Sequence, residues 1–232
     1  MTLTQLKLTF LTAVLGAFVC ASNGSASAIA YNSFGPNDTY ESYGNWQGSD
    51  FFGETKLSQR FTPQASGVLN KIELGFFFTP PELGGITEQN VDELTLALVP
   101  DVNEYPGTQV LWSQFYAGNS PTDFGSVANF DVIDGPTLEA GTKYWLISRS
   151  ALVGYRPHSW YRAPSSDVPL PSPEPFAIAN PQTAGGQWVR LTWPHDPGFA
   201  LRVTVVPEPA AAALMIAASA TLLAIRRRTV SF

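Results

Sequence analysis

Short runs in which large apolar residues alternate with smaller or polar ones constrain this chain most strongly. The clearest is Leu94-Thr95-Leu96-Ala97-Leu98. A period of two is typical of a β-strand that buries one face. Seven other runs are rich in β-branched, aromatic and aliphatic residues, and no run shows the 3.6-residue period of an amphipathic helix. We therefore predict strands at 57–62, 68–79, 94–98, 109–117, 127–133, 142–148, 187–193 and 201–205.

Turn residues separate these runs. Pro80-Pro81 and Gly84-Gly85 follow the longest run, Pro106-Gly107 forms a turn, and Gly141 precedes another run. Charged residues make up only 14% of the chain, which also favours a turn-rich, aromatic-cored β protein. We predict an all-β domain at 29–205, a two-layer antiparallel β-sandwich that is jelly-roll-like. Seven prolines between 157 and 181 predict a proline-rich loop at 156–186.

The N-terminal 28 residues have the pattern of a signal peptide. Lys7 supplies a positive charge, residues 8–21 are uncharged and apolar, and Ala26-Ser27-Ala28 offers the small residues that signal peptidase accepts. We expect a signal helix and cleavage after Ala28. The single cysteine, Cys20, falls in this segment, so the exported body is expected to have no disulfide.

The C-terminal segment 206–232 has three parts in order. Val206-Pro207-Glu208-Pro209 comes first, an uncharged stretch at 210–225 follows, and Arg226, Arg227 and Arg228 come last. We expect a transmembrane helix at 210–225, which spans only ~24 Å of a ~30 Å hydrocarbon core. The basic cluster places the C-terminus in the cytoplasm and the preceding domain outside.

This tail resembles the PEP-CTERM sorting signal of bacterial exosortase systems. The resemblance implies that an exosortase-type enzyme recognises and processes the tail after export in a Gram-negative bacterium. The body resembles the choice-of-anchor type of exported domain in Gln59-Arg60-Phe61-Thr62, the segment from Asp101 to Pro106-Gly107, the segment 138–146, and Phe199-Ala200-Leu201-Arg202-Val203. That second resemblance implies a jelly-roll-like sandwich and carries over no active-site residues.

Charge narrows the classes of partner. Of 13 basic residues, Lys7 and the three terminal arginines lie outside 29–206, and of 19 acidic residues only Glu208 does. The body therefore has nine basic and 18 acidic residues. A field of about nine negative charges repels phosphate, so we expect no nucleic acid as a partner.

Catalytic and metal-binding patterns are weak. His158 and His195 are the only histidines and are far apart in sequence, so we expect no metal site from them. Asp101, Asn103 and Glu104 bunch together and leave structural calcium open as an alternative. No nucleophile motif or phosphate-binding loop occurs, so we expect no catalytic residues and no cofactor. A glycoside hydrolase needs only two carboxylates, which sequence spacing does not exclude.

Aromatic residues crowd the proline-rich segment. Tyr155, Trp160 and Tyr161 are candidates for stacking on sugar rings if they are exposed. The alternative, which we favour, is that this segment and the aromatic N-terminal stretch fold back and cap the sandwich.

The sequence thus predicts a non-catalytic bacterial surface or extracellular-matrix protein. It is held transiently in the inner membrane through its C-terminal helix, with signal peptidase and an exosortase-type enzyme as partners. One alternative is a carbohydrate-binding module for extracellular polysaccharide. A third reading is a secreted glycoside hydrolase.

Overall fold

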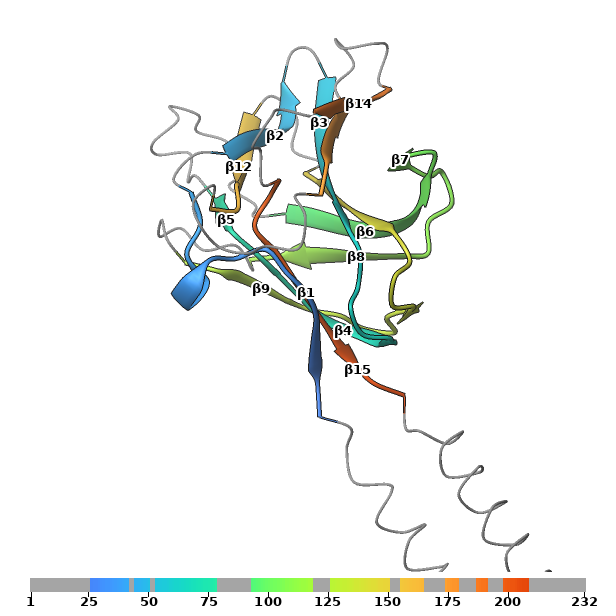
Figure 1. The fold of residues 1–232 in the computed structure, drawn as a ribbon. Coiled ribbons are helices and arrows are strands. Elements are labelled where there is room, and N and C mark those ends of the chain that lie inside the picture. Colours follow the sequence, from blue (N-terminus) through green and yellow to red (C-terminus); the bar gives the residue numbers. More distant parts are fainter. Residues whose placement is uncertain are drawn as a thin grey trace, which may run out of the picture. The chain divides into compact units, whose positions relative to one another are not determined.

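The computed structural model describes residues 26–41, 44–50, 53–78, 93–118, 126–150, 155–164, 174–179, 187–191 and 198–208 (Figure 1). Residues Ser27–Val206 form one compact unit. Its elements in chain order are β1 (Ala28–Asn32), η1 (Pro36–Asp38), β2 (Gly44–Asp50), β3 (Gly53–Phe61), β4 (Gly67–Leu74), β5 (Phe76–Phe78), β6 (Glu93–Val102), β7 (Tyr105–Pro106), β8 (Trp112–Ala117), β9 (Ala128–Asp131), β10 (Thr137–Leu138), β11 (Tyr144–Arg149), β12 (Tyr155–Tyr161), β13 (Phe176–Ala179), β14 (Trp188–Leu191) and β15 (Leu201–Val206).

The strands form two sheets. The smaller has the order β1-β15-β4-β10, with β9 also paired to β4. The larger has the order β5-β12-β2-β3-β11-β6-β7, with β13 and β14 added beside β3 and β8 beside β6. Every strand pair within the described residues is antiparallel. The prediction of an all-β, antiparallel domain is therefore confirmed.

One hydrophobic core joins the two sheets. The alternation in β6 buries Leu94, Leu96 and Leu98, each at most 1% exposed. They belong to the same cluster as Ile72 and Leu74 of β4 in the smaller sheet. Burying each such side chain stabilises the fold by about 1.5–3 kcal/mol, and no disulfide contributes. The face of β6 that the sequence pattern predicts to be buried is therefore the face that holds the sheets together.

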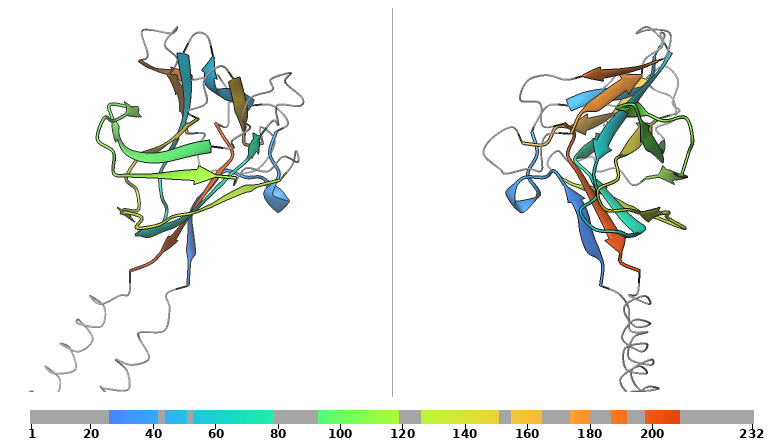
Figure 2. Two further views of the ribbon diagram at one scale, coloured as in Figure 1. Left: turned by 180° about the vertical axis from the view of Figure 1, so that it is seen from behind. Right: turned by 45° about the vertical axis from the view of Figure 1, so that its right-hand side comes forward.

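The larger sheet curls into a nearly closed, barrel-like form (Figure 2). Its strand β14 comes into contact with β7. Inside this curl lies a second, smaller apolar cluster, centred on the fully buried Trp145 with Val99 and Ala177. An ion pair between Arg190 of β14 and Glu104 of the β6–β7 turn links these two edges of the larger sheet.

The prediction of a long loop at 156–186 is wrong in two places. Strand β12 lies between β5 and β2, and β13 pairs with β3, so both belong to the larger sheet. Proline content suggested a loop, but the β12 register shifts between Tyr155 and His158, where Pro157 stands. A proline has no N–H to donate, and a strand tolerates it at such an irregularity.

The run at 68–79 is two strands and not one. Gly75 separates β4 of the smaller sheet from β5 of the larger sheet. The Gly75 N–H donates to the Ala200 carbonyl at 3.0 Å, and the Gly75 carbonyl accepts the Tyr161 N–H at 2.8 Å. A Cβ at this position would meet the Ala200 Cβ at 2.8 Å. The chain therefore crosses between sheets at a point where backbones approach too closely for a side chain.

Most of the predicted targeting segments lie outside the described residues. These are the apolar stretch of the signal, Pro209, the helix at 210–225 and the arginines at 226–228. Within the described ranges, no helix reaches the length and apolar character that crossing a membrane requires.

Candidate functional site

The first and last strands of the compact unit lie side by side. Strands β1 and β15 are antiparallel, with Ala28 opposite Val205 and Ile29 opposite Thr204 (Figures 1 and 2). Strand β1 begins at Ala28 and β15 ends at Val206. The predicted cleavage site and the predicted sorting motif therefore adjoin the compact unit at neighbouring positions. We call β1 and β15 together the terminal strand pair.

The sequence explains where the terminal strand pair stops. Val206 still pairs with Val68 of β4, but Pro207 lies outside the strand and Glu208 is exposed. Proline lacks the N–H that a further ladder bond needs. At the other end Ala26 is exposed and Ala28 is half-buried. Cleavage after Ala28 would remove a single residue from β1.

Side-chain bonds hold the opposite end of the terminal strand pair. The Ser33 hydroxyl donates to the Phe199 carbonyl at 2.9 Å and accepts the Leu201 N–H at 2.9 Å. Arg202 of β15 makes ion pairs with Asp38 and Glu73. The N-terminal and C-terminal strands are thus joined from Ala28 to Ser33, with one register shift between Ile29 and Tyr31.

The candidate sugar-stacking residues are buried. Trp160 is 0% exposed, its indole N–H donates to the Ala200 carbonyl at 3.0 Å, and its ring stacks on Phe199 with centroids 4.9 Å apart. Tyr161 is 8% exposed and stacks on Tyr40. The less favoured alternative, in which Trp160 and Tyr161 offer an exposed platform, is therefore wrong, because β12 is an internal strand. The third candidate, Tyr155, begins β12, but its side chain is not among those that the structure describes.

The acidic loop that suggested calcium is a tight hairpin turn. Asn103 and Glu104 have φ values of 53° and 69°, as a two-residue type I′ turn requires. The Asp101 carboxylate accepts the Glu104 N–H at 2.9 Å and the Trp145 indole N–H at 3.0 Å. Hydrogen bonding to Arg190 lowers the pKa of Glu104. The carboxylate oxygens of Asp101 and Glu104 thus bind the turn backbone, the Trp145 indole and Arg190.

A buried arginine organises this region. Arg60 of β3 donates through Nε to Glu174 Oε2 at 2.7 Å, and its Nη1 lies 3.6 Å from Asp101 Oδ2. Thr62 Oγ1 donates to the other Glu174 oxygen at 2.6 Å. Sequence reasoning missed Glu174, which stands 114 residues from Arg60 and carries no motif. Across the described part of the chain, no group of three or more metal-ligating side chains gathers.

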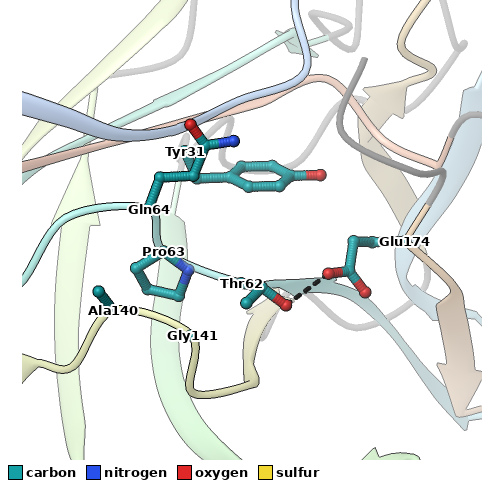
Figure 3. Close-up of a pocket in the computed structure, with 7 residues that line it drawn as sticks. All are labelled: Tyr31, Thr62, Pro63, Gln64, Ala140, Gly141 and Glu174. Atoms are coloured by element: carbon teal, nitrogen blue, oxygen red, sulfur yellow. Dashed lines mark hydrogen bonds between the residues drawn. The ribbon is translucent and has the colours of Figure 1, made fainter. Parts of the chain in front are cut away.

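Glu174 and Thr62 line a cavity of about 530 Å³ (Figure 3). The other lining residues described are Tyr31, Pro63, Gln64, Ala140 and Gly141. The Tyr31 ring is 3% exposed, and its phenol oxygen lies on the side of Glu174 (Figure 3). Burial, followed by the negative charge of Glu174, raises the pKa of Tyr31, so the phenol keeps its proton.

Hydrogen bonds fix the walls of this cavity from several directions. The Gln64 N–H donates to the Ala30 carbonyl at 2.7 Å, and the Gly141 N–H donates to the Pro63 carbonyl at 2.8 Å. Gln59 holds the backbone of Glu174 through a 3.0 Å bond from Nε2 to its carbonyl. Strand β1, the turn after β3 and the turn before β11 therefore form a preformed cavity.

A scan against protein-family models finds no family that matches this chain, and a search of curated proteins also finds no match.

Proposed function

We propose that this chain is an exported bacterial surface or extracellular-matrix protein without catalytic activity. Signal peptidase removes residues 1–28, and an exosortase-type enzyme processes the tail that begins at Val206. The observation that carries the proposal is the pairing of Ala28 with Val205. This pairing makes one end of the terminal strand pair the point of attachment for both targeting segments.

The geometry suits a domain held at a single point. If both segments enter the same membrane, a folded domain must have its two ends close together, and the terminal strand pair provides this. Between Val206 and the expected helix at 210–225 stand only Pro207, Glu208 and Pro209. Three extended residues span about 10 Å. A processing enzyme would meet the motif directly beside the folded domain.

For the fold we infer a jelly-roll-like sandwich of the choice-of-anchor type. Two antiparallel sheets that share one core support this assignment. The curl of the larger sheet around Trp145 is a departure from a simple two-layer arrangement.

Two features favour a non-catalytic role. Glu174 is the one carboxylate among the described residues that line the cavity, whereas glycoside hydrolysis ordinarily needs two. Its charge is also matched by Arg60. The carbohydrate-binding alternative loses two of the three residues on which it rested, since Trp160 and Tyr161 are core residues.

The test is to express the full chain in a host that carries an exosortase and to compare it with the double variant Pro207→Ala, Pro209→Ala. Mass spectrometry of both protein ends and immunoblots of cell fractions are the readouts. We expect the native chain to start at Ile29, lose its tail and leave the inner membrane, while the double variant keeps its tail and stays there.

A matched control is Pro106→Ala, which changes a proline away from both ends and should be processed as the native chain is. Tail removal at the native rate in the double variant would contradict the proposal. So would an unprocessed native chain in a host whose exosortase is active on another substrate.

A further inference from the structure

The cavity beside Tyr31 and Glu174 has the features of a preformed binding site. Its walls come from β1, the turn after β3, the turn before β11 and Glu174, two residues before β13. Backbone bonds at 2.7 and 2.8 Å tie Gln64 to Ala30 and Gly141 to Pro63. A ligand therefore has little chain to order when it binds, which removes one of the main costs of association.

The polar groups in the cavity suit a ligand that both donates and accepts hydrogen bonds. Each Glu174 oxygen accepts one bond, from Thr62 or from Arg60, and a carboxylate oxygen has room for a second. Gln64 offers an exposed carboxamide that has both donors and an acceptor. Hydroxyl groups match this set because each one donates and accepts.

Charge argues for a neutral ligand. Arg60 Nε lies 2.7 Å from Glu174, so this carboxylate already has its counter-ion and a second cation gains little. An anionic ligand would meet Glu174 at close range in a body that carries about nine negative charges. The exposed Ala140 methyl group supplies apolar surface, and the lining also includes the buried rings of Pro63 and Tyr31. The volume of about 530 Å³ falls within the range of small-molecule sites.

We propose that this cavity binds one neutral sugar ring, such as the terminal hexose of a polysaccharide, through hydroxyl contacts to Glu174 and Gln64. This inference rests on the cavity alone and goes beyond the proposed export and sorting. The proposed sugar-binding position is the opening beside Gln64 and Ala140, whereas the sequence suggested Trp160, which is buried.

The probes are methyl α-D-glucopyranoside, methyl α-D-galactopyranoside and methyl α-D-mannopyranoside, with D-glucuronate and D-glucosamine as charged counterparts. Saturation-transfer NMR and calorimetry on the full chain, in a detergent without a sugar headgroup, measure binding. For a single ring we expect at least one neutral glycoside to bind with a Kd on the order of 1 mM. Glucuronate should bind at least about tenfold more weakly because of repulsion from Glu174.

The decisive variant is Ala140→Phe, which fills the cavity from an exposed turn position and should abolish binding. Ala117→Phe, at an exposed position in β8, is the matched control and should bind as the native chain does. Gln64→Ala should weaken binding several-fold, and circular dichroism confirms that each variant is folded.

Three results would overturn the inference. One is that no neutral glycoside binds at about 50 mM, roughly fifty times the expected Kd. Another is binding that Ala140→Phe leaves unchanged. The third is glucosamine binding more tightly than every neutral ring, which would assign the cavity to cations. Because the readout is sugar binding and not cell fraction, its failure is distinct from a failure of the sorting proposal.

Discussion

Replacing Trp160 tests whether the proline-rich segment is core or binding surface. The ring is 0% exposed and stacks on Phe199 at 4.9 Å, and its N–H bonds to the Ala200 carbonyl. Truncation of a buried tryptophan to alanine costs about 3–5 kcal/mol through lost burial and the cavity left behind. We therefore expect Trp160→Ala to lower the free energy of unfolding by about 4 kcal/mol, a large part of the 5–15 kcal/mol typical of domains.

The Trp160→Phe variant separates packing from hydrogen bonding. The Ala200 carbonyl also accepts the Gly75 N–H at 3.0 Å, so it stays paired when the indole is lost. Phenylalanine keeps a ring against Phe199, so we expect a smaller loss of about 1–2 kcal/mol.

Urea unfolding followed by circular dichroism measures these losses, with the slope checked for constancy. At 2–4 °C per kcal/mol, Trp160→Ala should lower Tm by roughly 8–16 °C. Phe115→Ala is the control, because that side chain is 57% exposed and its removal should change stability by no more than about 0.5 kcal/mol. A loss below about 1 kcal/mol for Trp160→Ala would refute the placement of this ring in the core.

Three further predictions concern the cavity, a close backbone approach and the terminal strand pair. In the unfolded chain Tyr31 loses its proton near the ordinary pKa of 10.0, whereas in the folded chain burial and Glu174 raise the pKa. The contribution of the protonated phenol to the free energy of unfolding is therefore complete below pH 10 and declines above it. Tyr31→Phe should flatten that alkaline decline in urea midpoints, and parallel curves for the two proteins would contradict the assignment. Gly135→Ala places a Cβ against the Leu69 carbonyl oxygen, so the backbone there must shift. In Gly141→Ala the Cβ meets open space, and the cost is only the roughly 1–2 kcal/mol of an alanine at a φ of 80°. We therefore expect Gly135→Ala to lower the calorimetric Tm further, and the reverse order would count against the packing. In a Cys20→Ser background, cysteines that replace Ile29 and Thr204 should form a disulfide, seen on a non-reducing gel, because these residues are directly opposite each other. Cysteines that replace Ile29 and Lys71 should not, because those positions are two strands apart, at about 9.5 Å. Equal cross-linking of both pairs would exclude the register.

Much of the fold could be predicted from the local pattern of apolar and polar residues. Each of the eight predicted runs overlaps at least one strand, and the run at 94–98 lies wholly within β6. The missed strands were the short ones, such as β7 and β10, and those whose residues read as loop, such as β12 and β13. Two-residue strands exist only because a neighbour pairs with them, so no local period marks them.

The candidate site was harder to predict from the sequence than the fold. Pro207 predicts where the last strand must stop, and the structure ends β15 at Val206. By contrast, Thr62 and Glu174 were invisible as a pair because a salt bridge or hydrogen bond between distant residues leaves no spacing to read. Tyr31 carried no sequence signal beyond its place in the aromatic N-terminal stretch.

Side-chain alternation and the missing N–H of proline are local properties, so the amino-acid pattern alone indicates which strand faces are apolar and where proline interrupts a ladder. The folded structure was needed to show that Trp160 is enclosed, that Glu174 meets Arg60, and that Ala28 lies opposite Val205. These outcomes depend on which strands become neighbours and in what register. That choice is made by the packing of the whole core, to which residues far apart in the chain contribute together.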